Sequence, residues 1–367
     1  MIDLKALKLY GRQDIRFEET APPAIQQEND VIIKVKAVGI CGSDISRYNK
    51  LGPYVPGMVF GHEFSGEVVA VGESVTQIQV GDRVAGCPAL YCGHCKSCQK
   101  AEYSRCENLT VIGSKKPGAY AEYTKLPAEN IIKLPDAIDY DSGAMIEPSA
   151  VVLHGLYKTN IQPGADVAIV GCGSIGLLAI QWAKIFGAKT IYAIDVDEEK
   201  LELAKTLGAD ILINASQETA YQKLRDWTDG VDLAIEAAGS PATSAEIFAL
   251  CRKGGQVLYL GIPYSDVNIE RFYFEKVVRN ELKVIGSWNG LSAPFPGKEW
   301  HTTLHYLNNG QLNILPIISD RLALKQGPEL FKQISDKTYT YSKVIFYPEL
   351  DAGSQMINPY QHFQQLI

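Results

Sequence analysis

The sequence lacks any apolar run that approaches the length of a membrane-spanning helix. Its N-terminus carries charges at Asp3, Lys5 and Lys8, so it has no apolar segment of the kind that a signal peptide needs. Positive charge is also scarce, because 35 Lys and Arg residues stand against 42 Asp and Glu residues. The resulting net charge of −7 argues against nucleic acid or an acidic membrane surface as the main partner, whereas a small anionic substrate needs only local positive charge. We expect a soluble, cytoplasmic protein.

The chain of 367 residues is long enough for about two domains, and 46% of its residues are hydrophobic. Residues 1–152 are rich in glycine, proline and short β-type runs such as 31–38 and 67–71, with turn signals between them. This pattern predicts a compact, mostly-β domain with an inserted metal-binding lobe.

A different pattern follows, in which short apolar runs alternate with helical stretches. The runs that we interpret as strands are 166–170, 190–194, 231–236 and 256–261. This alternation predicts an α/β domain with a doubly wound parallel sheet over residues 153–288. Residues 289–367 begin as a proline-rich loop, and we expect them to return to the first domain through a strand at 343–347 and to end in a polar tail.

Four of the eight cysteines lie close together, at Cys92, Cys95, Cys98 and Cys106. Tight turns between the first three aim their sulfurs at one point, and the fourth closes a tetrahedral shell. A closed all-sulfur shell suits a structural zinc ion and leaves no position for substrate. Disulfides or unrelated thiols are the alternative, but this spacing is typical of metal ligands in a reducing compartment.

A glycine-rich turn follows the run at 166–170 and opens a helical stretch. This context turns a weak motif into a prediction of a dinucleotide site, because the helix N-terminus offers free N–H groups to pyrophosphate. Asp195 ends the next strand, where its carboxylate would accept hydrogen bonds from the ribose and repel a 2′-phosphate, so we expect NAD rather than NADP. A turn that serves packing alone is the alternative. The predicted cofactor-binding residues are Gly171, Gly173, Ser174, Ile175, Gly176 and Asp195.

A second, open metal site is suggested by Cys41, His62 and the carboxylates Glu63 and Glu147. Cysteine, histidine and a carboxylate form a sensible shell for a catalytic zinc that keeps one position open. Each residue also has an ordinary structural interpretation, and their distance along the chain leaves the shared site undecided from spacing alone.

Three segments, G-H-E-F-S-G-E-V at 61–68, V-G-D-R-V at 80–84 and C-G-H-C-K-S-C at 92–98, precede the glycine-rich turn. In this order they resemble the zinc-dependent medium-chain alcohol dehydrogenases, over residues 5–348. The resemblance implies a GroES-like, mostly-β catalytic domain with a Rossmann domain inserted in it. It also implies two zinc ions per chain, with the catalytic one in the cleft between the domains.

By this resemblance Cys41 and His62 are zinc ligands, and Glu147 and Glu63 share or exchange the next place. Members that oxidise ethanol carry cysteine where this chain has Glu147, and its Glu-Pro pair is similar to the polyol dehydrogenase branch. Asp44 is the expected partner that orients His62. Segments 111–116, 146–148, 284–288 and 296–300 bring the chain closer to polyol-phosphate dehydrogenases.

The expected reaction is oxidation of a secondary alcohol, whose pKa zinc would lower while its hydride passes to the nicotinamide. Ser43 is the expected first proton relay, with Glu147 and water as its exit, because no histidine stands at 45–47. Lys115 and Lys116 are candidate phosphate contacts, although paired surface lysines are common. An unphosphorylated polyol, a diol or threonine is the alternative substrate, and a non-catalytic binding protein is a remote one. We expect a homodimer or homotetramer.

Overall fold

The computed structural model describes residues 4–350, and the predicted tail lies largely outside this range. The chain forms two compact units. Within the described residues, unit 1 comprises 4–147, 291–308 and 314–350, and unit 2 comprises 148–290 and 309–313. The boundaries therefore fall at 147/148 and 290/291, beside the predicted divisions at 152/153 and 288/289.

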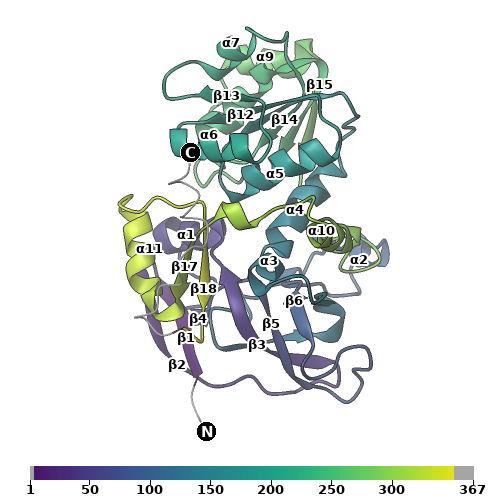
Figure 1. Ribbon diagram of the computed structural model, residues 1–367, viewed down its shortest axis with the longest axis vertical. Helices are drawn as coiled ribbons and strands as arrows, with labels where there is room; N and C mark the ends of the chain where they lie inside the picture. Colours follow the sequence, from purple (N-terminus) through teal and green to yellow (C-terminus); the bar gives the residue numbers. More distant parts are fainter. Residues whose placement is uncertain (1–3, 351–367) are drawn as a thin grey trace. The chain divides into compact units, whose positions relative to one another are not determined.

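Unit 1 is mostly β-structure (Figure 1). Its strands are β1 (Leu4–Gly11), β2 (Asp14–Thr20), β3 (Asp30–Gly39), β4 (Met58–Val59), β5 (Glu63–Val71), β6 (Arg83–Gly86), β7 (Ala89–Leu90), β8 (Thr110–Val111), β9 (Tyr123–Pro127), β10 (Ile131–Lys133), β17 (Ile318–Ala323) and β18 (Lys343–Tyr347). Its helices are α1 (Gly42–Ser46), α2 (Lys96–Gln99), α3 (Tyr140–Ala144), α10 (Lys298–Asn308) and α11 (Gly327–Ser335), with a π-helical turn at Arg47–Leu51 after α1.

The main sheet of unit 1 has the order β10-β6-β5-β3-β18-β17, and β9 also pairs with β3. A smaller sheet, β2-β1-β4, packs with it around one apolar core that includes Leu7, Phe64, Phe331 and Phe346. Strand β18 comes from the end of the chain yet pairs with β3, which places this strand in unit 1.

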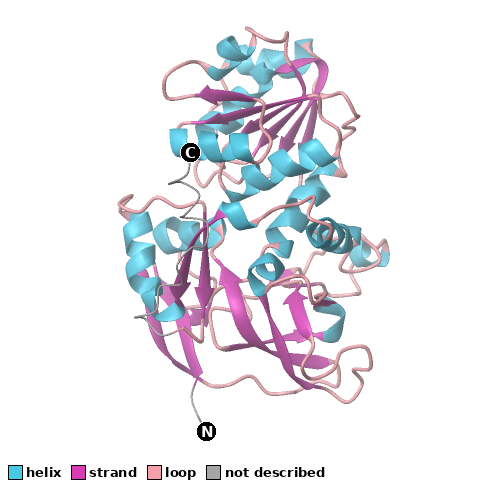
Figure 2. Ribbon diagram, in the orientation of Figure 1, coloured by secondary structure: helices cyan, strands magenta, loops and turns pink. Residues whose placement is uncertain are grey.

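Unit 2 is a parallel sheet in the order β13-β12-β11-β14-β15-β16. The strands are β11 (Asp166–Val170), β12 (Thr190–Asp195), β13 (Ile211–Asn214), β14 (Val231–Glu236), β15 (Cys251–Tyr259) and β16 (Lys283–Gly286). The helices are α4 (Ile146–Leu156), which starts at the unit boundary, α5 (Ser174–Ile185), α6 (Glu198–Thr206), α7 (Ala220–Leu224), α8 (Pro241–Glu246) and α9 (Arg271–Arg279). Helices lie on both faces of the sheet (Figure 2), so the successive residues 167–170 of β11 are all buried.

The predicted fold class, a GroES-like mostly-β domain plus a Rossmann domain, is confirmed. Four predicted strands match β11, β12, β14 and β18 closely, because uninterrupted apolar runs mark strands that are buried on both faces. The region after residue 288 is more regular than expected, since it also contains α10, β17 and α11. Within residues 4–350, no helix combines the length and apolar character needed to span a bilayer.

Candidate metal and cofactor sites

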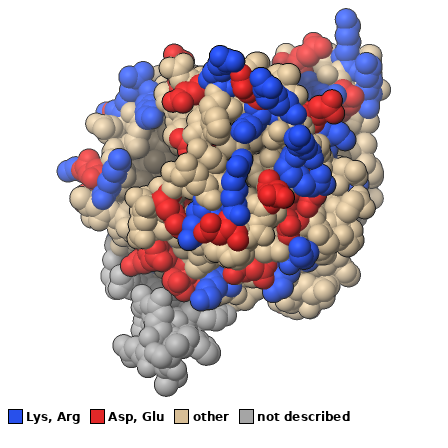
Figure 3. Space-filling model, turned by 90° about the horizontal axis from the view of Figure 1, so that it is seen from above, with Lys and Arg blue, Asp and Glu red and all other residues tan. Residues whose placement is uncertain are grey.

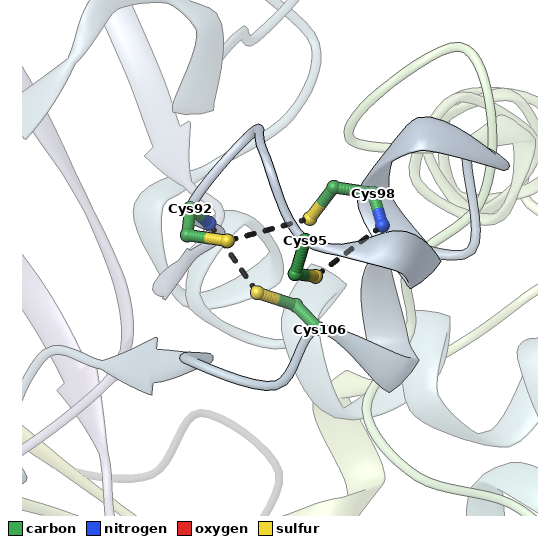
Figure 4. Close-up of side chains that lie close together, drawn as sticks. All are labelled: Cys92, Cys95, Cys98 and Cys106. Carbon is green, nitrogen blue, oxygen red and sulfur yellow. Dashed lines mark hydrogen bonds between the residues drawn. The ribbon is translucent and has the colours of Figure 1, made fainter.

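The four-cysteine lobe is built between β7 and β8, which pair antiparallel and close its base. The four sulfurs lie within 4.8 Å of one another and point inward (Figure 4). Cys92 Sγ is 4.0 Å from Cys98 Sγ, far longer than a disulfide of about 2.05 Å and close to the separation of about 3.8 Å in a tetrahedral zinc–thiolate site. The cysteines are free thiols, so the disulfide alternative does not fit.

Backbone N–H groups donate hydrogen bonds to sulfurs of this lobe, which favours the thiolate form that binds a cation. Cys95 caps α2 and its sulfur accepts the N–H of Cys98 at 3.5 Å, while Cys106 Sγ accepts the N–H of Cys92 at 3.3 Å. The N–H of His94 is the main cause that lowers the pKa of Cys92 to about 6, whereas burial raises the pKa of Cys98 to about 12. The chemistry of this donor set fits a structural zinc ion.

An aromatic cluster covers the lobe and joins it to a distant segment of unit 1. The rings of Tyr91 and Tyr103 pack at a tilt with centroids 4.6 Å apart, and the Phe295 ring lies 4.7 Å from Tyr91 and 5.7 Å from Tyr103. Phe295 therefore packs on the lobe, although the sequence predicts only a proline-rich loop in that part of the chain.

The second group of potential metal ligands consists of Cys41, His62 and Glu63, whose ligand atoms also lie within 4.8 Å of one another. Cys41 follows β3 and caps α1, and His62 immediately precedes β5. Because β3 and β5 pair with Gly39 opposite Glu63, their ends bring these side chains to one place. We call this group the open centre.

The buried carboxylate of Asp44 lies beside the open centre. Its Oδ2 accepts the N–H of Cys41 at 3.1 Å and the hydroxyl of Tyr120 at 2.6 Å. Its Oδ1 is 3.8 Å from His62 Nδ1, which is longer than a hydrogen bond, so the orienting role stays a prediction. Burial raises the pKa of Asp44. Tyr120 is a contact that the motifs did not reveal.

Negative charge accumulates around His62. Burial by itself would lower the pKa of His62, but Cys41, Asp44 and Glu147 together raise it well above its usual value. Glu147, in the first turn of α4, is not part of the 4.8 Å group found among residues 4–350. Burial, followed by repulsion from nearby carboxylates, raises its pKa to about 7. A cation bound here would relieve this repulsion, so the donor set fits zinc.

Lys343 is the most important residue that the sequence did not reveal. Its ammonium group donates hydrogen bonds to Glu63 Oε2 and, at 2.9 Å, to the carbonyl of Ile40. The side chains of Lys343 and Glu63 are only 2% and 3% exposed. The available signal was weak: a lysine at the start of the apolar run at 343–347.

The glycine-rich turn between β11 and α5 has the form that a dinucleotide site needs. Gly171 has φ of +94°, and a side chain there would meet the backbone of Ala238 at 2.6 Å. A side chain at Gly176 would clash with the Gly171 carbonyl. Gly173, the N-cap of α5, faces open space, which leaves room for a pyrophosphate at the helix N-terminus. Ser174 and Ile175 form the first turn of α5.

Asp195 ends β12 beside this turn. Its Oδ2 accepts the N–H of Cys172 at 2.6 Å, and Oδ1 accepts the N–H groups of Val196 at 2.7 Å and Asp197 at 3.0 Å. The carboxylate is therefore fixed by its own turn and by the glycine-rich turn, and Oδ2 keeps a lone pair for a ribose hydroxyl.

Lys115 and Lys116 are exposed on a hairpin that packs beside the strand leading to His62. The hairpin is closed by the bond from the Gly113 N–H to the Lys116 carbonyl at 2.8 Å. The next residues run along 59–61, and the Ala119 N–H donates to the Gly61 carbonyl at 2.9 Å.

On the face shown in Figure 3, lysine and arginine alternate with acidic residues and form no continuous basic field.

Comparisons with known proteins agree with both units. Residues 27–136 match the alcohol dehydrogenase GroES-like domain, and residues 174–307 match the zinc-binding dehydrogenase domain. The chain is 36% identical over 337 residues to galactitol 1-phosphate 5-dehydrogenase of Escherichia coli K12, covering 91% of this chain and 97% of the relative. This chain belongs to the zinc-dependent medium-chain dehydrogenases. It is an enzyme of that family, as the motifs predicted.

Members with other substrates and cofactors are nearly as similar. Sorbitol dehydrogenase of Bacillus subtilis is 33% identical over 353 residues, covering 94% of this chain and 98% of that protein. The crystal structure of the E. coli galactitol-1-phosphate dehydrogenase has a TM-score of 0.88 at 35% identity and covers 94% of this chain and 100% of that one. A zinc-binding dehydrogenase from Sinorhizobium meliloti bound to NADP has a TM-score of 0.86 at 32% identity, with coverages of 95% and 100%.

Proposed function

We propose that this dehydrogenase oxidises a secondary alcohol of a polyol phosphate, similar to galactitol 1-phosphate, to the keto sugar phosphate with NAD. The observation that carries the substrate class is the pair of exposed lysines, Lys115 and Lys116, on a hairpin hydrogen-bonded to Gly61, the residue before His62. Two ammonium groups on this hairpin would supply local positive charge in a protein that is acidic overall. The similarity to galactitol 1-phosphate 5-dehydrogenase supports the same class.

In this proposal the chain binds two zinc ions. The four cysteines of the lobe hold one, and Cys41, His62 and Glu147 hold the other with Glu63 close by. When bound, the second zinc supplies a Lewis acid that lowers the pKa of the substrate hydroxyl. Ser43 lies in α1 two residues after Cys41, where its hydroxyl is the proposed first acceptor of the substrate proton. Glu147 then passes the proton to water.

The proposed cofactor is NAD, because the fixed carboxylate of Asp195 accepts ribose hydrogen bonds and repels a 2′-phosphate. In the Asp195→Ala variant, we expect NAD to bind on the order of tenfold more weakly and NADP to gain relative to it. Asp195→Asn is the control, since an amide oxygen still accepts from the Cys172 N–H. An unchanged NAD-to-NADP ratio of kcat/KM in both variants would exclude Asp195 as the ribose ligand.

The proposed assembly is a homo-oligomer that pairs through unit 2. Strand β16 is the edge of the parallel sheet, and its residues Lys283, Val284 and Gly286 are exposed, whereas parallel sheets are normally covered. Exposed apolar residues gather in the same segment: Ile262, Val267, Ile269, Phe272, Phe274, Val278, Val284 and Trp288. A monomeric mass in sedimentation at micromolar concentration would refute this. The cytoplasmic location stays part of the proposal.

The substrate proposal is tested by reduction of NAD with galactitol 1-phosphate, galactitol, sorbitol, a vicinal diol and threonine. We expect the phosphorylated polyol to have the highest kcat/KM. The similarity to sorbitol dehydrogenase makes an unphosphorylated polyol the second candidate, and equal kcat/KM for galactitol and its phosphate would favour it. No NAD or NADP reduction with any of these alcohols would instead favour a different substrate or the remote non-catalytic alternative.

The lysine pair is tested by replacing Lys115 and Lys116 with alanine. The KM for the polyol phosphate should rise roughly 10- to 100-fold, with little change for the free polyol and a smaller effect at high salt. Lys96 and Lys100, exposed on the lobe, give a matched double-alanine control with the same change in net charge. Equal increases in KM for both substrates would show that Lys115 and Lys116 are solvated surface residues that make no phosphate contact.

A further inference from the structure

A pocket with a volume of about 320 Å³ lies in unit 2, at the amino ends of the sheet strands. It is lined by residues 160–165, which lead into β11, and by early residues of β14, β15 and β16. The glycine-rich turn follows the carboxyl end of β11, so the length of the sheet separates the two places. The volume is at the lower end of the range of about 300–1,000 Å³ for small-molecule sites. We call this the amino-edge pocket.

A nearly buried amide of the pocket has one end without a partner. The side chain of Gln256 lines the pocket, and this residue is 9% exposed. Its Oε1 accepts the backbone N–H of Asn160 at 3.0 Å, which fixes the oxygen end of the amide, because an N–H needs an acceptor. In the part of the chain that the structure describes, Nε2 donates no hydrogen bond. Its N–H groups are therefore available to a molecule in the pocket.

Lys283 supplies a cation on the same face of the sheet. Parallel pairing places Lys283 of β16 beside Gln256 of β15, so the two side chains project in the same direction. Lys283 is exposed, and its ammonium group has neither an ion pair nor a hydrogen bond within residues 4–350. A ligand that contacts Gln256 Nε2 can therefore also receive the charge of Lys283.

The two other charged groups of the pocket balance each other. Asp232 Oδ1 accepts from Arg252 Nε at 2.7 Å and contacts Arg252 Nη2 at 2.5 Å. Asp232 Oδ2 accepts the backbone N–H of Asp166 at 2.8 Å. The carboxylate of Asp232 is thus neutralised and hydrogen-bonded, which leaves the charge of Lys283 uncompensated. Donors and positive charge favour an anionic ligand over a cation.

We propose that the amino-edge pocket binds a small organic anion through a carboxylate or phosphate group. The anionic oxygens accept hydrogen bonds from Lys283 Nζ and Gln256 Nε2, and Ile161 and Pro163 offer apolar surface to the rest of the molecule. The lining includes none of the residues assigned above to zinc, NAD or the substrate phosphate. The pocket is therefore a site for a further ligand of this dehydrogenase.

Calorimetric titration of the zinc-loaded, NADH-saturated protein with inorganic phosphate and with succinate tests the proposal. NADH occupies the dinucleotide site, and neither probe carries an alcohol that the enzyme could oxidise. We expect saturable binding of one anion per chain, with a Kd on the order of 1 mM or lower. Tighter binding of phosphate would identify the ligand as a phosphate ester, and tighter binding of succinate as a carboxylate. No saturable binding of either probe would overturn the proposal.

Two substitutions locate the bound anion. Gln256→Glu keeps an oxygen for the Asn160 N–H but replaces the free donors with an acceptor, and Lys283→Gln removes the charge. Each should weaken anion binding on the order of tenfold or more. Lys253→Gln is the matched control, because Lys253 is exposed beside Arg252 but does not line the pocket, and it should leave the Kd within about twofold.

Wild-type anion affinity in both Gln256→Glu and Lys283→Gln would show an adventitious ion only and would overturn the proposal. Lys283 lies on β16, the edge strand proposed for assembly, so sedimentation of each variant accompanies the titrations. Gln256 lies on β15, inside this edge, and Gln256→Glu decides the test if Lys283→Gln changes the assembly. NADH affinity, measured by fluorescence, should be unchanged in all three variants. Failure of the anion site would therefore leave the proposed dehydrogenase function untouched.

Discussion

The two groups of potential metal ligands in unit 1 are built in opposite ways. The lobe takes all its potential ligands from residues 92–106 and uses sulfur alone. The open centre takes its potential ligands from residues 41 and 62–63, mixes sulfur, nitrogen and oxygen, and has Asp44 and Lys343 beside it. A local set of identical ligands suits a metal that only holds a fold together. A mixed set drawn from several strands leaves room for substrate and for tuning by neighbouring charges.

The largest expected effect separates the two centres by function. In Glu147→Gln, turnover should fall on the order of a hundredfold or more. Loss of a residue that only supports a metal ligand costs about 10- to 100-fold, and loss of a ligand should cost no less. NAD affinity should stay within about twofold, because the Rossmann unit binds the dinucleotide. Steady-state kinetics and fluorescence titration with NADH measure the two quantities. Turnover that survives within a few-fold would make Glu147 structural and favour Glu63 as the ligand.

A second variant separates the centres by stability. Cys98→Ser should lose about one zinc per chain and lower the melting temperature, because metal binding and folding of the lobe are coupled. The zinc of the open centre should remain at first. Cys251→Ser is the matched control, since Cys251 is a buried free cysteine of unit 2 outside both centres. Metal analysis that finds two zinc ions in Cys98→Ser would contradict the predicted lobe.

The third prediction concerns pH and has a smaller effect. Zinc binding requires deprotonated ligands, so both centres should weaken as pH falls. The raised pKa values of His62 and Glu147, the latter to about 7, favour the proton over the metal. In the lobe the pKa of Cys92 is lowered to about 6 and that of Cys98 is raised to about 12, so retention of its zinc depends on the closed shell of four thiolates. Between pH 8 and pH 5 the open centre should lose its zinc before the lobe, as zinc content after equilibration at each pH would show. Loss in the reverse order would contradict this difference.

The same contrast explains how much of the molecule the sequence reveals. The lobe and the strand at 166–170 with its glycine-rich turn were predictable, because their chemistry lies in contiguous residues. Strand β18 was recognisable as an apolar run, but its pairing with β3 places Lys343 on Glu63, and this depends on contacts between residues 280 positions apart. Helix α11 was not predicted, although Leu330, Phe331 and Ile334 form a buried face, because the chain after residue 288 was interpreted as largely irregular.

Contacts with the lobe and with Asp44 were hidden for the same reason. Phe295 reaches Tyr91 from the segment after unit 2, and Tyr120 donates to Asp44 from 76 residues away. No periodicity or spacing in the sequence marks such pairs. Motifs therefore identified the candidate ligands, while the charges that determine how those ligands behave came from the packing of distant strands.

Anomalous X-ray scattering at the zinc absorption edge, from crystals grown with zinc, tests the central claim most directly. The account predicts two peaks in each chain. One peak should lie among Cys92, Cys95, Cys98 and Cys106, and the other should be bound by Cys41, His62 and Glu147, with Glu63 remaining on Lys343. A second peak that is absent, or one ligated by Glu63 in place of Glu147, would contradict the account.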